Sequence, residues 1–389
     1  MRGLGLACVI ALSCSRAPAP PPSVPAAASS TAVAIAPPVA PPIASASASA
    51  SASAPVDASS LPLVLDDIVY DPDTGARRRA ARAGEAGWPD ESAPAAESVA
   101  LGDGAVSLKD ASGKVLWRTP VKGSLGSVRP PDRTLTKAHV VAVVDGRLVA
   151  FRRDNGATAW TVGGPVDRLL GDGEMVLSTD CQSPSAPPPH RWLMARRALD
   201  GAEVWKLELP KDVDPDGIEK IGAYYIVHMG KRAAFVTAQG KVAFELDDDL
   251  VEVAPQSIGW LIVTTKRIAR LDESGKAIWT LPAMRDTFVA GAGVTAVPGG
   301  DLLLWGWGRI NDSGVELLRV RPDDGKVVFR TRAEALGVGH SKYGHHAYVR
   351  LRGSKVDVVS IGSYGTFVEV RALASGSRLS RWKPKESPP

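Results

Sequence analysis

Residues 272–279 read DESGKAIW, and this short stretch decides the fold, because a polar turn ends in Gly275 and a tryptophan follows four positions later. An aspartate in such a turn can bond the nearby backbone, and the glycine tolerates the positive φ that a tight hairpin requires. Beyond the glycine, alternate residues can lie on one buried face of a strand. The stretch therefore predicts a β-hairpin whose tryptophan, Trp279, packs inside the protein.

The same form occurs seven times, and this self-similarity is the strongest signal in the chain. The other six copies are residues 109–117 (KDASGKVLW), 153–160 (RDNGATAW), 198–205 (ALDGAEVW), 237–244 (TAQGKVAF), 322–329 (PDDGKVVF) and 372–382 (ALASGSRLSRW). The turn glycines are Gly113, Gly156, Gly201, Gly240, Gly275, Gly325 and Gly376. The aromatic residues four positions later, predicted to pack between units and not to form a ligand cage, are Trp117, Trp160, Trp205, Phe244, Trp279 and Phe329. In the last copy the register slips, and Trp382 follows its glycine by six positions.

The repeat length predicts the architecture. The glycines are 35 to 51 residues apart, which leaves room for several short strands per unit. One four-stranded sheet cannot bury both of its faces, but sheets stacked radially bury them against one another. We therefore predict an all-β fold, a β-propeller of four-stranded blades over residues 61–389. Seven motifs favour seven blades, with residues 61–70 as the strand that closes the ring. Eight blades are the alternative, because residues 71–75 (DPDTG) look like an eighth motif with Arg79 at the aromatic position.

The repeated run resembles the PQQ-like propeller repeat, in which a run similar to Ala-Leu-Asp-x-x-Thr-Gly-Lys-x-x-Trp marks each blade. The resemblance covers residues 98–384 and implies the propeller fold. The family includes BamB-like lipoprotein scaffolds and quinoprotein dehydrogenases. The resemblance therefore does not decide between binding and catalysis.

The N-terminal region predicts export and a tether. Arg2 precedes an apolar stretch, residues 3–12, that is too short to span a bilayer, and Ser13-Cys14 follows it. The arrangement resembles a bacterial lipobox, so residues 1–14 are interpreted as a lipoprotein-type signal peptide with Cys14 as the lipidation site. A plain secretory signal that is cleaved a few residues later is the alternative. Residues 15–60 are almost wholly Ala, Pro, Ser and Val, which predicts a disordered linker.

Charge and cysteine content exclude several classes. The net charge of +4 is small for 389 residues, and no basic stripe with interleaved aromatics occurs, so no nucleic-acid partner is expected. The one basic run, residues 77–79 with Arg82 close by, is predicted to lie in a solvated loop. Cys8 and Cys14 belong to the signal region. Cys181 is then alone, and the folded part has no internal disulfide.

The sequence offers few candidates for catalysis. Quinoprotein dehydrogenases resemble one another in an adjacent cysteine pair and a bound calcium, whereas Cys181 has no neighbouring cysteine. Residues 247–249 are three aspartates that are expected to form an exposed turn. His340, His345 and His346 could share a Zn²⁺ or Cu²⁺ ion, but adjacent histidines on a strand point to opposite faces, which favours a solvated loop. We therefore expect no enzyme activity, no cofactor and no metal.

Loops remain as candidate binding elements. Residues 179–190 (TDCQSPSAPPPH) interrupt one repeat, and inserts of this kind on propeller faces often bind partners, although loops also tolerate insertions without function. The leading interpretation is a non-catalytic cell-envelope lipoprotein, held at a membrane by its lipid, that binds envelope proteins through propeller loops. Outer-membrane protein assembly is one such role. The alternative is a surface binder of carbohydrate or a small ligand in the central channel, and a PQQ-dependent dehydrogenase is the remote one.

Overall fold

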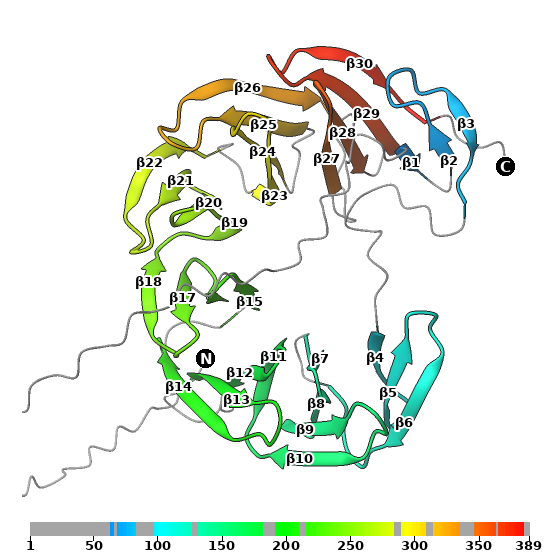
Figure 1. Cartoon of the computed structure of the whole chain (residues 1–389), viewed down its shortest axis with the longest axis vertical. Coiled ribbons are helices and arrows are strands. Elements are labelled where there is room, and N and C mark those ends of the chain that lie inside the picture. The colour runs from blue at the N-terminus through cyan, green and yellow to red at the C-terminus, as the bar shows by residue number, and fades with distance from the viewer. Residues whose placement is uncertain are drawn as a thin grey trace, which may run out of the picture. The chain divides into compact units, whose positions relative to one another are not determined.

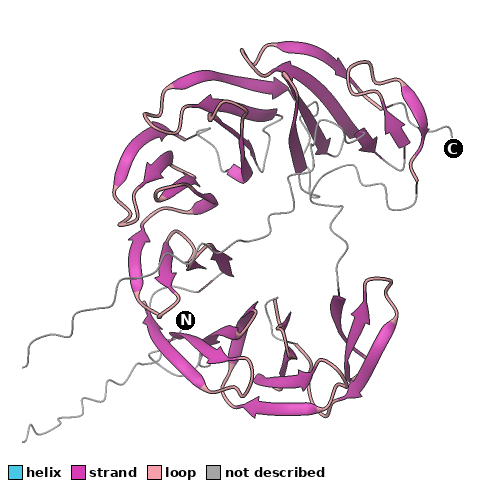
Figure 2. Ribbon diagram, in the orientation of Figure 1, coloured by secondary structure: helices cyan, strands magenta, loops and turns pink. Residues whose placement is uncertain are grey.

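The computed structural model describes residues 63–65, 68–82, 97–126, 131–181, 191–210, 215, 217–283, 289–308, 314–334, 346–362 and 365–384. Within these residues every helix or strand element is a β-strand, as Figure 2 shows. No helix in this part of the chain is long and apolar enough to cross a bilayer. The described strands all belong to one compact unit, Ser53–Pro389, the second of the two into which the chain divides. Cys14 and the linker predicted at residues 15–60 lie outside the described residues.

The described strands form eight antiparallel sheets. The first sheet is β1 (Leu63–Leu65), β2 (Ile68–Tyr70) and β3 (Arg77–Ala80), and the second is β4 (Glu97–Gly102), β5 (Ala105–Asp110) and β6 (Val115–Pro120). The third sheet is β7 (Arg133–Leu135), β8 (His139–Val144), β9 (Arg147–Arg152) and β10 (Thr158–Val162). The fourth is β11 (Val166–Asp172), β12 (Met175–Cys181), β13 (Arg191–Arg197) and β14 (Glu203–Leu209).

The remaining four sheets follow the same order. The fifth is β15 (Gly217–Ile221), β16 (Tyr224–His228), β17 (Ala233–Thr237) and β18 (Val242–Leu246), and the sixth is β19 (Leu250–Pro255), β20 (Trp260–Thr264), β21 (Arg267–Leu271) and β22 (Ala277–Pro282). The seventh is β23 (Val289–Ala296), β24 (Leu302–Gly308), β25 (Gly314–Val320) and β26 (Val327–Glu334). The eighth is β27 (His346–Arg352), β28 (Lys355–Gly362), β29 (Gly365–Ala372) and β30 (Arg378–Trp382).

Neighbouring strands of each sheet are consecutive in the chain, which is the topology of propeller blades. Figure 1 shows the first strand of the four-stranded sheets, such as β11, on the inside of the second unit and the last, such as β14, on the outside. The repeat glycine lies in the turn between the third and fourth strands. In the first two sheets Gly75 and Gly113 lie between β2 and β3 and between β5 and β6, so the three described strands correspond to the outer three of a blade.

The described strands form eight blades, the alternative count, and not the seven that the motifs favoured. Residues 61–70 do not contribute one closing strand. Instead β1 and β2 pair with each other, Leu65 opposite Ile68, and with β3 they make a separate sheet. The prediction that residues 77–79 lie in a loop is also wrong, because all three belong to β3, whose residues are exposed. An outermost strand needs no buried side chains, so a run of arginines can form one.

The core lies between sheets. Val106 and Leu108 of the second sheet pack with Val140, Ala142 and Phe151 of the third, and every one of them is buried. Similar apolar clusters join the later sheets. Burial of such side chains contributes roughly 1.5–3 kcal/mol each before conformational entropy is subtracted. Each sheet therefore depends on its neighbour for stability.

The antiparallel order gives every sheet two different ends. One end carries the glycine turns between third and fourth strands and the turns between first and second strands; we call it the turn face. The opposite end carries the connections between second and third strands and those from one sheet to the next; we call it the loop face. The stretches that hold the longer connections, such as residues 182–190 and 309–313, join strands whose described ends lie on the loop face.

The first and eighth sheets are held together across the chain. Leu63, Leu65 and Tyr70 lie in one apolar cluster with Val359 and Val368 of the eighth sheet. The carboxylate of Asp73 accepts hydrogen bonds from Arg352 at 2.7 Å and from Lys355 at 2.9 Å. The hydrogen bond from Arg352 is the main reason why the pKa of Asp73 is lowered from its ordinary value. Residues from the two ends of the propeller are therefore neighbours in the fold.

Candidate protein-binding face

The turn glycines and the aromatic residues of the repeat motif meet between consecutive sheets, on the turn face. The aromatic ring on the outer strand of one sheet lies against the turn glycine of the next, so closely that a β-carbon on the glycine would come within 3.0 Å of the ring. These pairs are Trp117 with Gly156, Trp160 with Gly201, Trp205 with Gly240, Phe244 with Gly275, Trp279 with Gly325, Phe329 with Gly376 and Trp382 with Gly75. These residues of the turn face are thus used in contacts between sheets, so less of this face is available to bind a partner.

Each tryptophan of these pairs also makes a polar contact. Its indole N–H donates to a carbonyl two or three residues before the glycine, at 2.7–2.9 Å. Trp382 does so as well, to the Pro72 carbonyl, although its register is shifted. The shift is two residues, and a strand with a period of two keeps a side chain on the same face after such a shift.

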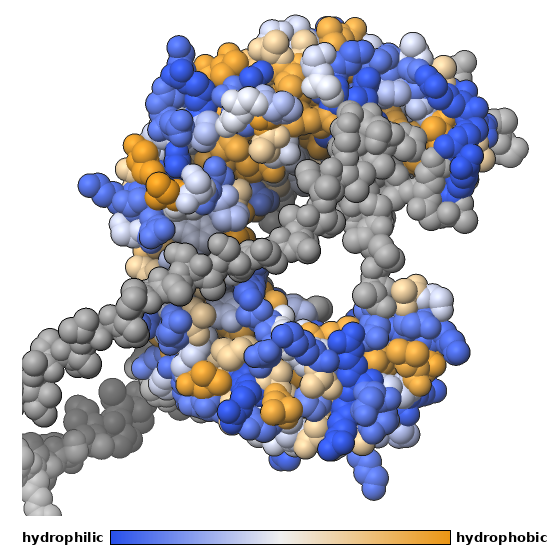
Figure 3. Space-filling model, in the orientation of Figure 1, coloured by the Kyte–Doolittle hydropathy of each residue, from blue (hydrophilic) through white to orange (hydrophobic). Residues whose placement is uncertain are grey.

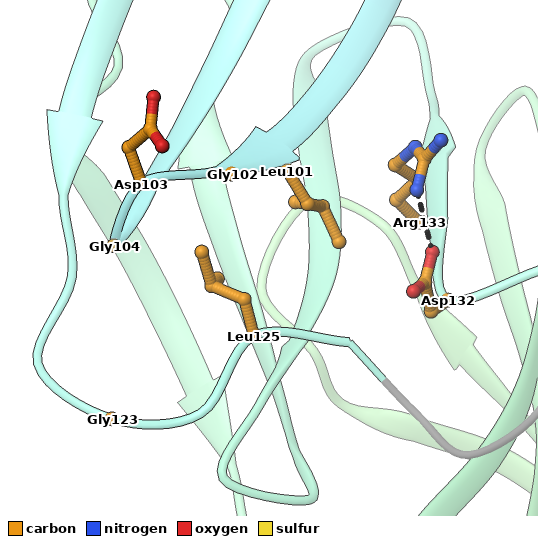
Figure 4. A pocket seen from close by; sticks show the side chains of 8 residues that line it. All are labelled: Leu101, Gly102, Asp103, Gly104, Gly123, Leu125, Asp132 and Arg133. Atoms are coloured by element: carbon orange, nitrogen blue, oxygen red, sulfur yellow. Dashed lines mark hydrogen bonds and ion pairs between the residues drawn. The ribbon is translucent and has the colours of Figure 1, made fainter.

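The loop face holds a hollow between the second and third sheets. It has a volume of about 330 Å³ and is open to solvent. It is lined by Leu101, Gly102, Asp103, Gly104, Gly123, Leu125, Asp132 and Arg133. In Figure 4 the side chains of Leu101 and Leu125 lie between the Asp103 turn and the Asp132–Arg133 pair. Apolar side chains bordered by charged ones are typical of a surface that receives a protein side chain.

The frame of this hollow is fixed by two tight turns. Asp103–Gly104 and Asp145–Gly146 both have positive φ at both residues, as in the turns that favour two-residue hairpins. The Asp145 carboxylate accepts a hydrogen bond from the Ser124 amide at 2.6 Å, beside Gly123. The protein's own turns and this hydrogen bond therefore fix the backbone around the hollow without a partner.

The charged pair at the edge of the hollow is held in place. Arg133 donates to Asp132 at 2.9 Å, and the Asp132 side chain is only 15% exposed while that of Arg133 is 43% exposed. The arginine therefore presents its charge to solvent from a fixed position. Sequence reasoning missed these residues, although the two Asp-Gly pairs were a usable signal for hairpin turns at this face.

A second polar group lies on the inner strands of the fifth and sixth sheets. Glu219 of β15 is hydrogen-bonded to His228 of β16 at 2.8 Å. Burial, together with the charge of Glu219, raises the pKa of Glu252 on β19 to about 7. The two glutamates are 33 residues apart in the chain, so their proximity depends on how the sheets stack and not on a local motif.

The structure changes the interpretation of the aspartates at residues 247–249. Asp248 is buried, contrary to the exposed turn expected for all three, and its carboxylate contacts Lys266 at 2.8 Å and Arg267 at 2.9 Å. Asp247 is exposed. The buried Asp248 carboxylate forms ion pairs with these two basic side chains of the sixth sheet. They compensate for the hydration that the carboxylate loses on burial.

The remaining predicted candidates lie wholly or partly outside the described residues. His340 and His345 lie outside them, and His346 is the first residue of β27. Cys181 is the last residue of β12, and the insert that follows it is outside. Among the described residues, no three His, Cys, Asp or Glu side chains lie together as a metal site. The sequence also has no adjacent cysteine pair like the one by which the quinoprotein dehydrogenases resemble one another.

Comparison with known proteins supports the class that the repeat predicted. A family model described as outer membrane protein assembly factor BamB matches residues 66–253. The matched part is just under half of the chain, and the described sheets have the antiparallel four-stranded order of propeller blades. No curated protein sequence matches the chain.

Two solved structures illustrate the range of similar proteins. BamB from Moraxella catarrhalis is 11% identical, with a TM-score of 0.44, and the match covers 74% of this chain and 86% of that one. The quinohemoprotein alcohol dehydrogenase ADHIIG from Pseudomonas putida HK5 is also 11% identical, with a TM-score of 0.45. That match covers 74% of this chain but 65% of the dehydrogenase, less than two thirds of its length. At this level of similarity neither structure assigns a function.

Proposed function

We propose that this protein is a non-catalytic scaffold of the cell envelope that binds other proteins through the loop face of its propeller. The observation that carries the proposal is the match of residues 66–253 to the BamB family model, a family described by its part in outer membrane protein assembly. A role in that assembly, with a lipid anchor at Cys14, is the specific form of the proposal.

The two ends of the sheets support the choice of the loop face. The turn face is occupied by seven aromatic–glycine contacts, whereas the loop face carries the longer connections and the hollow beside Leu125. Loops held by a rigid scaffold are where binding residues collect, because they can vary without disturbing the core. The hollow offers two leucines for an apolar anchor and the fixed charge of Arg133 for a polar contact at its edge.

Crosslinking in the cell tests this proposal. A photoreactive amino acid would replace Leu125 on the loop face, and in a matched strain Ser112 on the turn face. Captured proteins would be identified by mass spectrometry. We expect specific envelope proteins from position 125 and not from position 112. Equal capture at both positions, or none at position 125, would contradict the proposal.

Charge reversal sharpens the same test. Arg133→Glu should reduce capture at position 125 about tenfold or more, as expected for loss of a charge-assisted contact. Arg152→Glu changes an exposed arginine at the turn-face end of β9 and should leave capture unchanged.

An enzyme assay tests the dehydrogenase alternative. A purified sample supplied with PQQ and Ca²⁺ should reduce no dye with alcohols or aldoses, and dye reduction would support the dehydrogenase alternative instead.

The anchor is tested separately. Cys14→Ala should release the protein from the membrane fraction and abolish labelling with a fatty-acid probe. If the variant still partitions with membranes and is processed as before, the lipoprotein part of the proposal is wrong while the scaffold part stands.

A further inference from the structure

Basic side chains are concentrated on the first and eighth sheets. Their described residues, 63–65, 68–82, 346–362 and 365–384, contain eleven arginines and lysines but four aspartates and glutamates, a surplus of seven positive charges. The net charge of the whole chain is +4, so all its other residues together carry −3. The modest net charge of the chain therefore conceals a strongly basic part of the propeller.

The acidic side chains of these two sheets are already used in ion pairs. The pairs include Asp71–Arg78, Asp73–Arg352, Asp73–Lys355, Asp357–Arg350 and Glu369–Arg371. Six basic side chains are in excess of these acids, and all except the half-buried Arg381 are exposed. We call these six residues the basic edge: Arg77, Arg79, Arg82, Arg378, Arg381 and Lys383.

The basic edge follows two neighbouring outer strands. β3 and β30 contain two of its residues each, and Arg82 and Lys383 come shortly after these strands. The strands are neighbours because the Trp382 ring of β30 lies against Gly75, in the turn before β3, and its indole N–H donates to the Pro72 carbonyl at 2.8 Å. Figure 3 shows hydrophilic side chains gathered over β3, at the upper right of the view.

This concentration of charge is not a general property of the outer strands. Arg77 and Arg378 both stand two positions after the turn glycine of their repeat. The corresponding residues of the other six repeats are Val115, Thr158, Glu203, Val242, Ala277 and Val327. β10 and β22 contain no charged residue at all. Arginine at this position is therefore confined to two adjoining blades, which indicates a local surface and not a requirement of the fold.

We propose that the basic edge binds the phosphate groups of an anionic lipid surface. Five of its six residues are arginines, whose planar guanidinium groups can donate two parallel hydrogen bonds to the oxygens of one phosphate. The residues extend from the turn-face ends of both strands, at Arg77 and Arg378, to their loop-face ends, at Arg82 and Lys383. Such a spread suits a surface with many phosphate groups better than a single small anion.

The order of the chain supports a lipid surface as the occupant. The predicted tether, residues 15–60, joins the propeller just before the first sheet, which carries half of the basic edge. A flexible tether of this length spans about 35–40 Å, so a lipid at Cys14 would keep this edge within reach of a membrane. The attraction is screened by salt, so the edge orients the anchored domain and does not replace the anchor. The proposal rests on the envelope location proposed above but concerns a surface other than the loop face.

Vesicle flotation tests the proposal with the full-length Cys14→Ala protein, which cannot carry the lipid. The probe vesicles contain equal parts of phosphatidylcholine and phosphatidylglycerol. Pure phosphatidylcholine vesicles measure any binding by the apolar N-terminal residues. We expect binding to the anionic vesicles at about 0.1 M salt and its loss at about 1 M, where the Debye length falls to roughly 3 Å. Absence of salt-sensitive binding to the anionic vesicles would overturn the proposal.

Two variants with the same change in net charge locate the binding surface. The edge variant combines Arg77→Gln, Arg79→Gln and Arg378→Gln. The control variant removes three exposed lysines of other sheets by Lys114→Gln, Lys241→Gln and Lys276→Gln. Each basic side chain near an anionic membrane contributes roughly fivefold to affinity, so the edge variant should bind at least about tenfold more weakly, and the control within about twofold of the parent. Equal weakening of both would mean that net charge alone causes binding, and the proposal would be wrong.

Competing anions identify what the basic edge binds. Inorganic phosphate should release no more protein from the vesicles than chloride of the same ionic strength, and polyglutamate should bind at least about tenfold more weakly than the vesicles. Specific release by phosphate would assign the edge to a free anion, and equal binding of polyglutamate to an acidic protein; either result would overturn the proposal. Loop-face crosslinking at position 125 should persist in the edge variant, which separates failure of this proposal from failure of the scaffold role.

Discussion

The Gly75 turn of the first sheet and the Gly113 turn of the second sheet have the same form but different surroundings. Beside Gly75 lie the indole of Trp382 from the eighth sheet, an apolar cluster and the Asp73 ion pairs. Gly113 has no described atom within 4 Å of the position of a β-carbon, and the first sheet carries Arg79 where the other repeats carry an aromatic residue. The difference teaches that equal repeat turns do not make equal contacts, because the packing of each turn depends on the aromatic residue that another sheet supplies.

The largest effect is expected from Trp382→Ala. The change removes the ring from Gly75, its contact with Tyr70 at 5.4 Å between centroids, and the hydrogen bond to Pro72. Because Trp382 is only partly buried, the free energy of unfolding should fall by about 3 kcal/mol, the lower end of the range for a buried tryptophan. Trp382→Phe keeps the ring and loses only the N–H, so it should cost about 1 kcal/mol. Chemical denaturation measures both, and a loss for Trp382→Ala below that of the phenylalanine variant would remove the contrast between the two turns.

A smaller effect is expected from Asp73→Asn. The carboxylate is 40% exposed, and solvent screening limits the loss of its ion pairs to about 1 kcal/mol. Because the pKa of Asp73 is lowered in the folded state, its stabilisation is present above the ordinary value of 3.8 and is lost as the pH falls through the lowered value. Thermal melts of the wild type and the variant should therefore differ at pH 7 and converge in acid. Lys355→Met should show the same pH pattern, and a constant difference across pH would exclude the ion pair as the cause.

A gain, not a loss, is expected from Arg79→Trp. If the eighth aromatic fastens the second sheet as the other seven fasten theirs, unfolding should become harder by about 0.5–2 kcal/mol, as for other cavity-filling substitutions. Arg78→Trp places the same ring on the opposite face of β3 and should give no gain. Equal effects of the two variants would mean that the Gly113 turn does not receive the ring.

The last effect concerns the fifth and sixth sheets, where burial of Glu252 and the nearby charge of Glu219 disfavour its ionisation, in contrast with the opposite charges at the eighth-to-first boundary. The pKa of Glu252 is raised to about 7 from 4.5, so its ionisation opposes folding, and stability falls as the pH rises from about 4.5 through 7. Glu252→Gln should therefore be as stable as the wild type near pH 4 and more stable at pH 8, by melting temperature. The exposed Glu245→Gln serves as control, and a pH-independent difference would argue against a raised pKa of Glu252.

The sequence predicts the parts that depend on local rules. Glycine turns and alternating strands recur within each unit, so the β-propeller class followed from seven copies of one motif. The first sheet was harder to recognise, because Arg79 replaces the aromatic and the arginines of β3 look like a solvated run. Trp382 appeared out of register, yet a shift of two residues leaves a strand side chain on the same face.

The candidate sites could not be predicted in the same way. The hollow beside Leu125 joins a turn of the second sheet to the chain that enters the third, and its shape depends on how two sheets meet. Asp248 was expected to be exposed with its neighbours, and only its contacts with Lys266 and Arg267 reveal why it is buried. Such features arise from packing between residues that share no motif.

The pairing of Trp382 with Pro72 has a consequence for the growing chain. The two residues are 310 positions apart, and the first sheet has no complete neighbour until the eighth sheet exists. At about 5–20 residues per second, synthesis of that interval takes roughly 15–60 s. During this time Leu63, Leu65 and Tyr70 remain without the surface that later buries them. The propeller can therefore be completed only after its last strand has been made. Until then, the apolar residues of the first sheet depend for protection on factors that bind the nascent chain.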